Sequence, residues 1–190
     1  LRTAAMISRA ARPLMVMGSQ ALTRPDEAAR LADAVRRIGI PVYLAGMARG
    51  LLGVNDPLQF RHRRKEALRK ADLALLAGIP CDFRLDYGRG IASSAKIVSV
   101  NRSRRDLMLN RRPEVAVHSD PCLFIRALAG FFPLDTADTG PWFSALRTRE
   151  LERESEIDDF SREPGDRVNP VLLLNKIAGR INGNSIIVAD

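Results

Sequence analysis

The chain has 190 residues, a net charge of +8, 46% apolar residues and 27% charged residues. This composition is typical of a globular protein that is long enough to bury a real core. No apolar run reaches the roughly 18–20 residues of a membrane-spanning helix, so we expect no membrane span. The two cysteines, Cys81 and Cys122, are far apart in the sequence. They fit neither a disulfide scaffold nor a cysteine-based zinc site, which predicts a reducing, cytoplasmic location.

The positive charge is concentrated in the first two thirds of the chain. Residues 1–130 hold 23 Lys/Arg and 11 Asp/Glu, a net charge of +12, whereas residues 131–190 hold 7 and 11. Such an excess is compatible with nucleic acid, an anionic cofactor or an acidic partner. The densest basic run, residues 61–70, has only Phe60 as an aromatic neighbour. Because nucleic-acid binding favours interleaved aromatic side chains, we interpret the run as a solvated helix face and expect no nucleic-acid partner.

The first 130 residues alternate between apolar runs and helical patterns. Apolar runs predict buried strands at residues 12–18, 40–46, 72–78, 95–100 and 114–119. Helices are predicted at residues 23–39, where Gly39 ends the pattern, at residues 56–71, which are more polar, and at residues 120–132. Continuously apolar strands separated by helices predict a parallel sheet covered on both faces. We therefore expect an α/β, doubly wound, Rossmann-like domain of about five to six strands over residues 1–130.

The pattern changes after residue 130. Residues 131–168 predict a linker and connector, with a helix over residues 142–160 that has few apolar side chains. Asn169 can cap a helix that begins at Pro170, and residues 183–190 predict one more buried strand. A helix and a strand without partners cannot form a domain. We therefore expect residues 169–190 to be the truncated start of a further α/β domain, and the chain to be a fragment.

Ligands of open parallel sheets bind beyond the carboxyl ends of the strands. The first candidate there is Gly18–Gln20, which could let the backbone approach a phosphate or could simply form a tight turn. No Gly-x-Gly-x-x-Gly and no Walker A loop is present. The second candidate is the loop of residues 45–53, in which Arg49 could meet an anion. The alternative is a loop whose three glycines adopt positive φ angles.

Two further candidates follow the later strands. Asp82 and Arg84 could hold a ribose hydroxyl and a phosphate, or could form an internal pair that orders the loop. Asn101 stands at a strand end where nucleotide-binding sheets often carry an acid, and it can still form hydrogen bonds. His62 and His118 belong to no metal-ligand or catalytic-triad spacing. We therefore expect neither catalytic nor metal-binding residues in this chain.

Several segments together resemble the central domain of thiamine-diphosphate-dependent enzymes of the acetolactate synthase group, including the 2-hydroxyacyl-CoA lyase proteins. These segments are residues 12–21, 39–53, 71–89, 95–102 and 169–190, in that order. The resemblance implies an enzyme, a lyase or carboligase that makes or cleaves C–C bonds next to a carbonyl. It also implies a homodimer or tetramer in which the missing N- and C-terminal domains of the same chain are the partners of this one.

The resemblance further implies that thiamine diphosphate and Mg²⁺ are bound by the absent domains. The family's Gly-Asp-Gly motif for Mg²⁺ is not here, since Gly165-Asp166 is followed by Arg167. The chain would then be the structural or nucleotide-binding central domain and not itself catalytic. An alternative is a stand-alone nucleotide-binding module of Rossmann-like fold.

In relatives the central domain binds FAD or an ADP moiety, or has lost its ligand. Pro80 stands where FAD-binding relatives carry an arginine, and Asn101 where they carry an acid. FAD, an ADP moiety and an empty pocket therefore remain alternatives. Matching the segments places the implied contacts on the following residues: Gly18, Ser19, Gln20, Gly46, Met47, Asp82, Arg84, Asn101, Arg102 and Asp120.

Overall fold

The computed structural model describes residues 2–133 and 140–188. The chain divides into two compact units, residues 1–147 and residues 148–190. None of the helices within the described ranges is long and apolar enough to cross a membrane.

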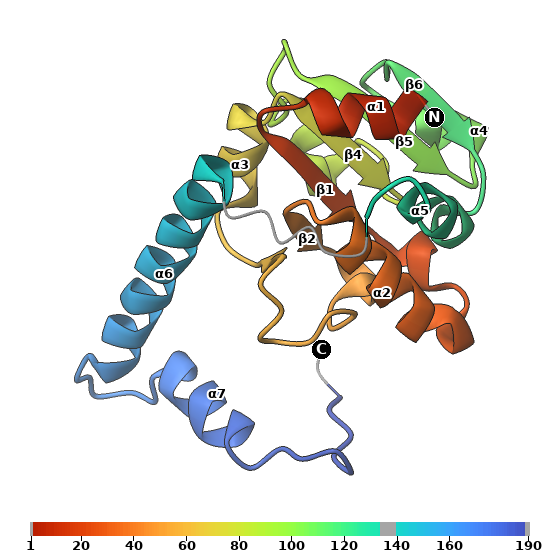
Figure 1. The fold of residues 1–190 in the computed structure, drawn as a ribbon. Helices are drawn as coiled ribbons and strands as arrows, with labels where there is room; N and C mark the ends of the chain where they lie inside the picture. Colours follow the sequence, from red (N-terminus) through yellow and green to blue (C-terminus); the bar gives the residue numbers. More distant parts are fainter. Residues whose placement is uncertain (1, 134–139, 189–190) are drawn as a thin grey trace. The chain divides into compact units, whose positions relative to one another are not determined.

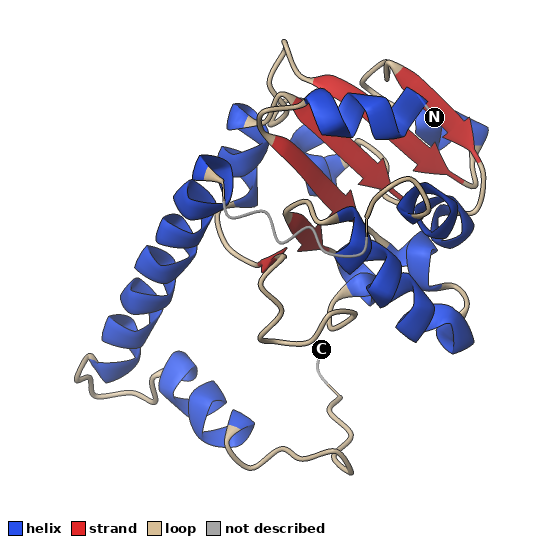
Figure 2. Cartoon of the chain, in the orientation of Figure 1, coloured by secondary structure: helices blue, strands red, loops and turns tan. Residues whose placement is uncertain are grey.

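The first unit is built on a six-stranded parallel sheet with the order β3-β2-β1-β4-β5-β6 (Figures 1 and 2). Every residue of the two central strands, β1 and β4, is buried, because helices cover both faces of the sheet. The strands are β1 (Pro13–Met17), β2 (Val42–Leu44), β3 (Gln59–Phe60), β4 (Leu73–Ala77), β5 (Lys96–Asn101) and β6 (Val115–His118).

The helices follow the crossover pattern of a doubly wound sheet. Helices α2 (Ala28–Ile38) and α5 (Pro121–Ala129) pack against each other. Right-handed crossovers place them on one face, and α3 (Arg64–Lys70) and α4 (Arg104–Leu107) on the other. Helix α1 (Arg2–Arg9) lies near the amino ends of β4, β5 and β6. The 3₁₀ segments η1 (Ser19–Leu22), η3 (Gly46–Ala48) and η4 (Phe83–Gly88) follow β1, β2 and β4 at the opposite, carboxyl edge.

The predicted α/β class is confirmed, and all five predicted strands of this unit are present. Gly39 ends α2 in the left-handed conformation, as its position predicted. The polar helix predicted over residues 56–71 is wrong in its first half. There the chain forms β3, and the helix begins only at Arg64. Phe60 is the reason, because its buried ring fixes this segment at the edge of the sheet.

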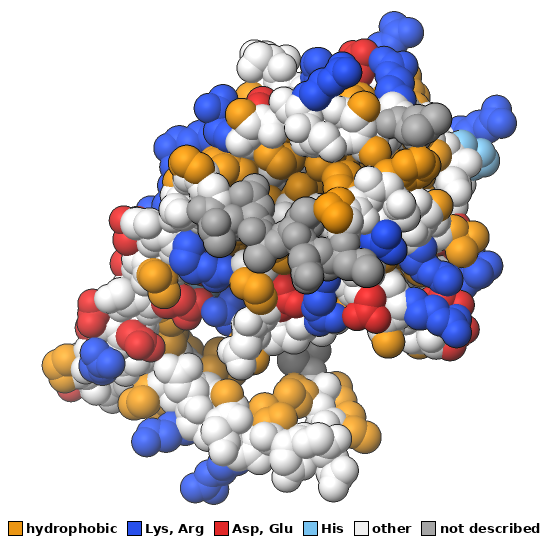
Figure 3. All heavy atoms as spheres, in the orientation of Figure 1, with side chains coloured by type: hydrophobic (Ala, Val, Ile, Leu, Met, Phe, Trp, Pro, Cys, Tyr) orange, Lys and Arg blue, Asp and Glu red, His pale blue; other side chains and the backbone are white. Residues whose placement is uncertain are grey.

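The second unit contains the end of α6 (Pro141–Arg162) and helix α7 (Pro170–Ala178). The predicted cap of α7 is confirmed, since the side chain of Asn169 accepts hydrogen bonds from the backbone of Val171 and Leu172. Several apolar side chains of α7 are exposed, including Leu174 at 63%. Hydrophobic side chains are visible on the surface of this part of the chain in Figure 3. The strand predicted from residue 183 is not formed by the described residues 183–188, because a strand needs a neighbour to pair with. The predicted domain boundaries at residues 130 and 168 stay predictions.

Candidate functional site

The strand order reverses direction between β1 and β4, and ligands of doubly wound sheets bind beyond this point. The structure shows two close-packed glycine turns here. The backbone N–H of Gly18 donates to Ala77 O at 2.9 Å. A Cβ on Gly18 would lie 2.6 Å from Gly78 O, and Gly78 itself has a φ of +70°. Both positions therefore require glycine in order to pack the two strand ends against each other.

Beside these turns, the loop after β2 is fastened to the loop after β1. Ser19 Oγ accepts a hydrogen bond from the backbone N–H of Met47 at 3.1 Å. A Cβ on Gly46 would lie 2.2 Å from the same oxygen, and the φ of Gly46 is +57°. Ser19, Gly46 and Met47 are thus brought together at the strand ends, and their contacts are with one another.

Gln20, Arg102 and Asp120 form a second set of internal contacts. Gln20 Oε1 accepts a hydrogen bond from the backbone N–H of Arg102 at 3.0 Å. The guanidinium of Arg102 lies 3.3 Å from Asp120 Oδ2. The other carboxylate oxygen of Asp120 caps α5 by accepting from the backbone of Cys122 at 2.8 Å. These polar groups therefore hold the carboxyl ends of β1, β5 and β6 together.

Asn101 is fully buried at this edge, and its side-chain amide has a donor without a hydrogen-bond partner among the described residues. Its side-chain oxygen accepts from Ser103 N at 2.9 Å, whereas its Nδ2 has no hydrogen-bond partner. A buried donor without a partner is unusual. We call the residues of this edge the strand-end cluster, and they are the following: Gly18, Ser19, Gln20, Gly46, Met47, Asn101, Arg102 and Asp120.

Asp82 lies directly before η4 and Arg84 is the second residue of η4, and the two side chains pair with each other. Arg84 Nη2 is 2.7 Å from Asp82 Oδ2, and Asp82 also accepts from the backbone N–H of Arg84. Burial raises the pKa of the neighbouring Cys81 thiol to about 11, which disfavours the thiolate and thus a nucleophilic role. The structure therefore shows the loop-ordering pair that the sequence offered as one of its alternatives.

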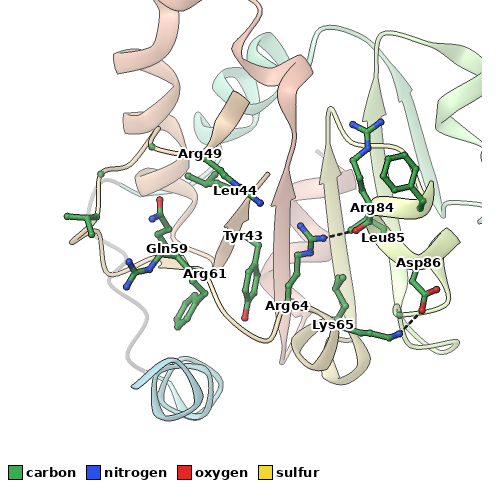
Figure 4. A pocket seen from close by; sticks show the side chains of 17 residues that line it. Tyr43, Leu44, Arg49, Gln59, Arg61, Arg64, Lys65, Arg84, Leu85 and Asp86 are labelled. Carbon is green, nitrogen blue, oxygen red and sulfur yellow. Dashed lines mark hydrogen bonds and ion pairs between the residues drawn. The ribbon is translucent and has the colours of Figure 1, made fainter. Parts of the chain in front are cut away.

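A cavity of about 720 Å³ opens beside this turn. Its polar lining is dominated by cationic side chains from three segments: Arg49 from the loop after β2, Arg61, Arg64 and Lys65 from the segment after β3 and α3, and Arg84 from η4. We call it the arginine cavity. Figure 4 shows Arg49 and Arg64 reaching into the space between Leu44 and Arg84. Of the predicted site residues, Arg84 lines this cavity.

The sequence indicates Arg49 as a possible anion contact, and it predicts a solvated helix face for residues 61–70. Arg64 does not fit that assignment, because its side chain lines the arginine cavity and is half-buried. Burial, and secondly the charge of Arg49, lowers the pKa of Arg64. Arg63, directly before α3, has a positive φ of +52°, and this turn of the chain before Arg64 is not visible in the sequence pattern.

Comparison with known proteins decides the family. The family model described as "Thiamine pyrophosphate enzyme, central domain" matches residues 2–128. The chain belongs to this family. Human 2-hydroxyacyl-CoA lyase 2 is 42% identical over all of the chain, and the Xenopus laevis protein of that name is 43% identical over 97% of it. A probable acetolactate synthase of Mycobacterium bovis is 30% identical over all of the chain.

The chain spans 30% of the length of the two lyases and 34% of the length of the synthase. The predicted resemblance is thus confirmed, and the chain is a domain of an enzyme whose relatives extend well beyond it.

Proposed function

We propose that the complete protein carrying this chain is a thiamine-diphosphate- and Mg²⁺-dependent enzyme that makes or cleaves a C–C bond next to a carbonyl. We further propose that it acts on a 2-hydroxyacyl-CoA. The observation that carries this choice is the 42% identity to human 2-hydroxyacyl-CoA lyase 2 over the whole chain, against 30% to the acetolactate synthase.

The role of this chain in that enzyme is structural and not catalytic. Thiamine diphosphate, when bound, would supply a nucleophilic carbon and an electron sink for the negative charge that develops next to the carbonyl. The donor set expected for its diphosphate and Mg²⁺ does not fit residues 165–167, Gly-Asp-Arg, where a second glycine would be needed. We therefore assign both to domains outside this chain and derive no step of the reaction from residues 1–190.

We also propose that the central domain holds a nucleotide moiety, either FAD or an ADP group. The buried Nδ2 of Asn101, which has no hydrogen-bond partner among the residues that the structure describes, supports a ligand with a hydrogen-bond acceptor at the strand ends. The strand-end cluster is otherwise engaged internally, so a ligand there would replace the Ser19–Met47 and Gln20–Arg102 hydrogen bonds. A homodimer or tetramer and a cytoplasmic location complete the proposal.

The activity is tested with the complete protein, thiamine diphosphate and Mg²⁺, by following the loss of a 2-hydroxyacyl-CoA and, in parallel, of pyruvate. We expect turnover of the CoA ester, none when either cofactor is omitted, and none by residues 1–190 alone. Turnover of pyruvate alone would replace the lyase assignment with a synthase. Turnover by the isolated chain would contradict its non-catalytic role.

A further inference from the structure

A further hollow lies at the amino edge of the sheet, at the end away from the strand-end cluster and the arginine cavity. Its volume is about 400 Å³. One side is a face of α1, and the other side is formed at the starts of three strands, by Asp72 and Leu73 at β4, Ser94 and Lys96 at β5, and Glu114 at β6. We call it the amino-edge hollow. No function proposed above uses these residues.

Helix α1 turns one face toward this hollow and buries a different one. Arg2, Ala5, Met6 and Arg9 all line the hollow, and their spacing of three and four residues places them on one side of the helix. The buried residues of α1 lie at other positions of the helical turn and pack into the core. Because Ala5 ends in a methyl group, space remains between the longer side chains on either side of it.

The two carboxylates in the lining are already engaged. Glu114 Oε1 lies 2.7 Å from Arg2 Nη2. The two oxygens of Asp72 accept hydrogen bonds from the backbone N–H groups of Ala11 and Arg12, at 2.8 and 2.9 Å. Asp72 therefore fixes the chain between α1 and β1, and neither carboxylate is left to neutralise a further cation.

Three donors in the lining have no such partner. The side chains of Arg9, Lys96 and Ser94 form no hydrogen bond or ion pair among the residues that the structure describes. The lining holds three cations and two carboxylates, so one positive charge is left over. This balance favours an anion with a single charge, such as a carboxylate, over a phosphate monoester, which carries nearly two charges at neutral pH.

The rest of the lining is apolar. Met6 and Ala10 are half-buried, and Leu73 is almost completely buried. A short hydrocarbon chain in contact with these side chains would leave water, which favours binding. The volume suits a small molecule.

We propose that the amino-edge hollow binds a small organic monocarboxylate, with its carboxylate on Arg9, Lys96 and Ser94 and its short apolar chain against Met6 and Leu73. Guanidinium groups bind carboxylates through paired, charge-assisted hydrogen bonds, and the ammonium and hydroxyl groups add further donors. The inference rests neither on the proposed nucleotide role nor on the proposed lyase activity, because it concerns the other edge of the sheet.

The test is a saturation-transfer NMR titration of the complete protein with butyrate as the probe. Butyramide has the same shape without the charge, and acetate has the charge without the chain. Arg9→Gln and Lys96→Gln each remove one cation, and the double variant removes both. Lys70→Gln is the matched control, because Lys70 is an exposed residue of α3 that does not line the hollow. Ala5→Leu keeps every charge and fills the space.

We expect each single cavity variant to weaken butyrate binding roughly 2- to 5-fold, because the charges are partly exposed, and the double variant to weaken it about 10-fold or more. Ala5→Leu should weaken binding although no charge is lost, and Lys70→Gln should leave it unchanged. Acetate should bind more weakly than butyrate. The signal of butyramide should be the same for the wild type and the double variant.

Equal butyrate affinity in the wild type and the double variant would overturn the inference. A loss in Lys70→Gln as large as in Lys96→Gln would also overturn it, since it would show general attraction of anions to the basic surface. Full affinity in Ala5→Leu would place the anion outside the hollow. Arg9 and Lys96 have no side-chain hydrogen bond to lose among the described residues, and if one variant fails to fold, the other decides together with Ala5→Leu.

Discussion

The strand-end cluster and the arginine cavity lie at the same edge of one sheet, yet they differ in whether their polar side chains have partners within the protein. In the strand-end cluster, Ser19, Gln20 and Asp120 all have protein partners, and Gly18 and Gly78 leave no room for a Cβ. In the arginine cavity, Arg49 and Arg64 have no carboxylate as an ion-pair partner among the described residues, and the one carboxylate in the lining, that of Asp86, is paired with Lys65. The comparison teaches that a fold's customary ligand position and its available binding groups need not coincide.

The largest effect on stability is expected from adding a side chain at Gly18, where two strand ends are in contact. Gly18→Ala places a methyl group 2.6 Å from Gly78 O, and the two strand ends must move apart. We expect a loss of about 1–3 kcal/mol in the free energy of unfolding, measured by denaturant titration. Gly50→Ala is the control, since nothing lies within 4 Å of its Cβ and only its positive φ is unfavourable. Equal losses for the two variants would argue against close packing at Gly18.

A smaller loss is expected from Asp120→Ala. This change removes the cap of α5 and leaves Arg102 without its carboxylate, and it should destabilise the protein by about 1–2 kcal/mol. Asp120→Asn keeps an N-cap oxygen and should recover much of the loss. Thermal unfolding of the two variants measures the difference. A stability equal to wild type in Asp120→Ala would show that the cluster is not held together as described.

The smallest effect is expected in the arginine cavity. Without ligand, Arg49→Gln should leave the melting temperature unchanged or slightly higher, because it removes a like charge beside Arg64 and breaks no hydrogen bond of the described residues. Differential scanning calorimetry at low salt measures the change. A fall of more than about 2 °C would mean that Arg49 stabilises the fold through a contact other than those described. The two regions would then no longer differ as proposed.

The sequence predicts the fold well because the sheet depends on local features. Five apolar runs correspond to the strands, and Gly39 and Asn169 mark a helix end and a helix start. The two-residue strand Gln59–Phe60 was missed because so short a segment shows no periodicity. The strand expected near Ile186 was predicted from its apolar run alone, and such a run does not form a strand without a neighbour.

The candidate site was predictable only in part. Topology alone brings residues such as Gln20 and Arg102 together, because the ends of neighbouring parallel strands share one edge. It does not say that these side chains bond to each other rather than to a ligand. The arginine cavity depends on the relative placement of Arg49, Arg64 and Arg84, which belong to three different crossovers. No spacing in the sequence encodes that placement.

The central claim is that the strand-end cluster is closed by its own hydrogen bonds, so that a nucleotide bound there must replace them. A crystal structure of the complete protein with ADP tests it most directly. The account predicts that bound ADP accepts a hydrogen bond from Asn101 Nδ2 and that the Ser19–Met47 and Gln20–Arg102 hydrogen bonds are broken. ADP seated at the strand ends with those two bonds intact would contradict it.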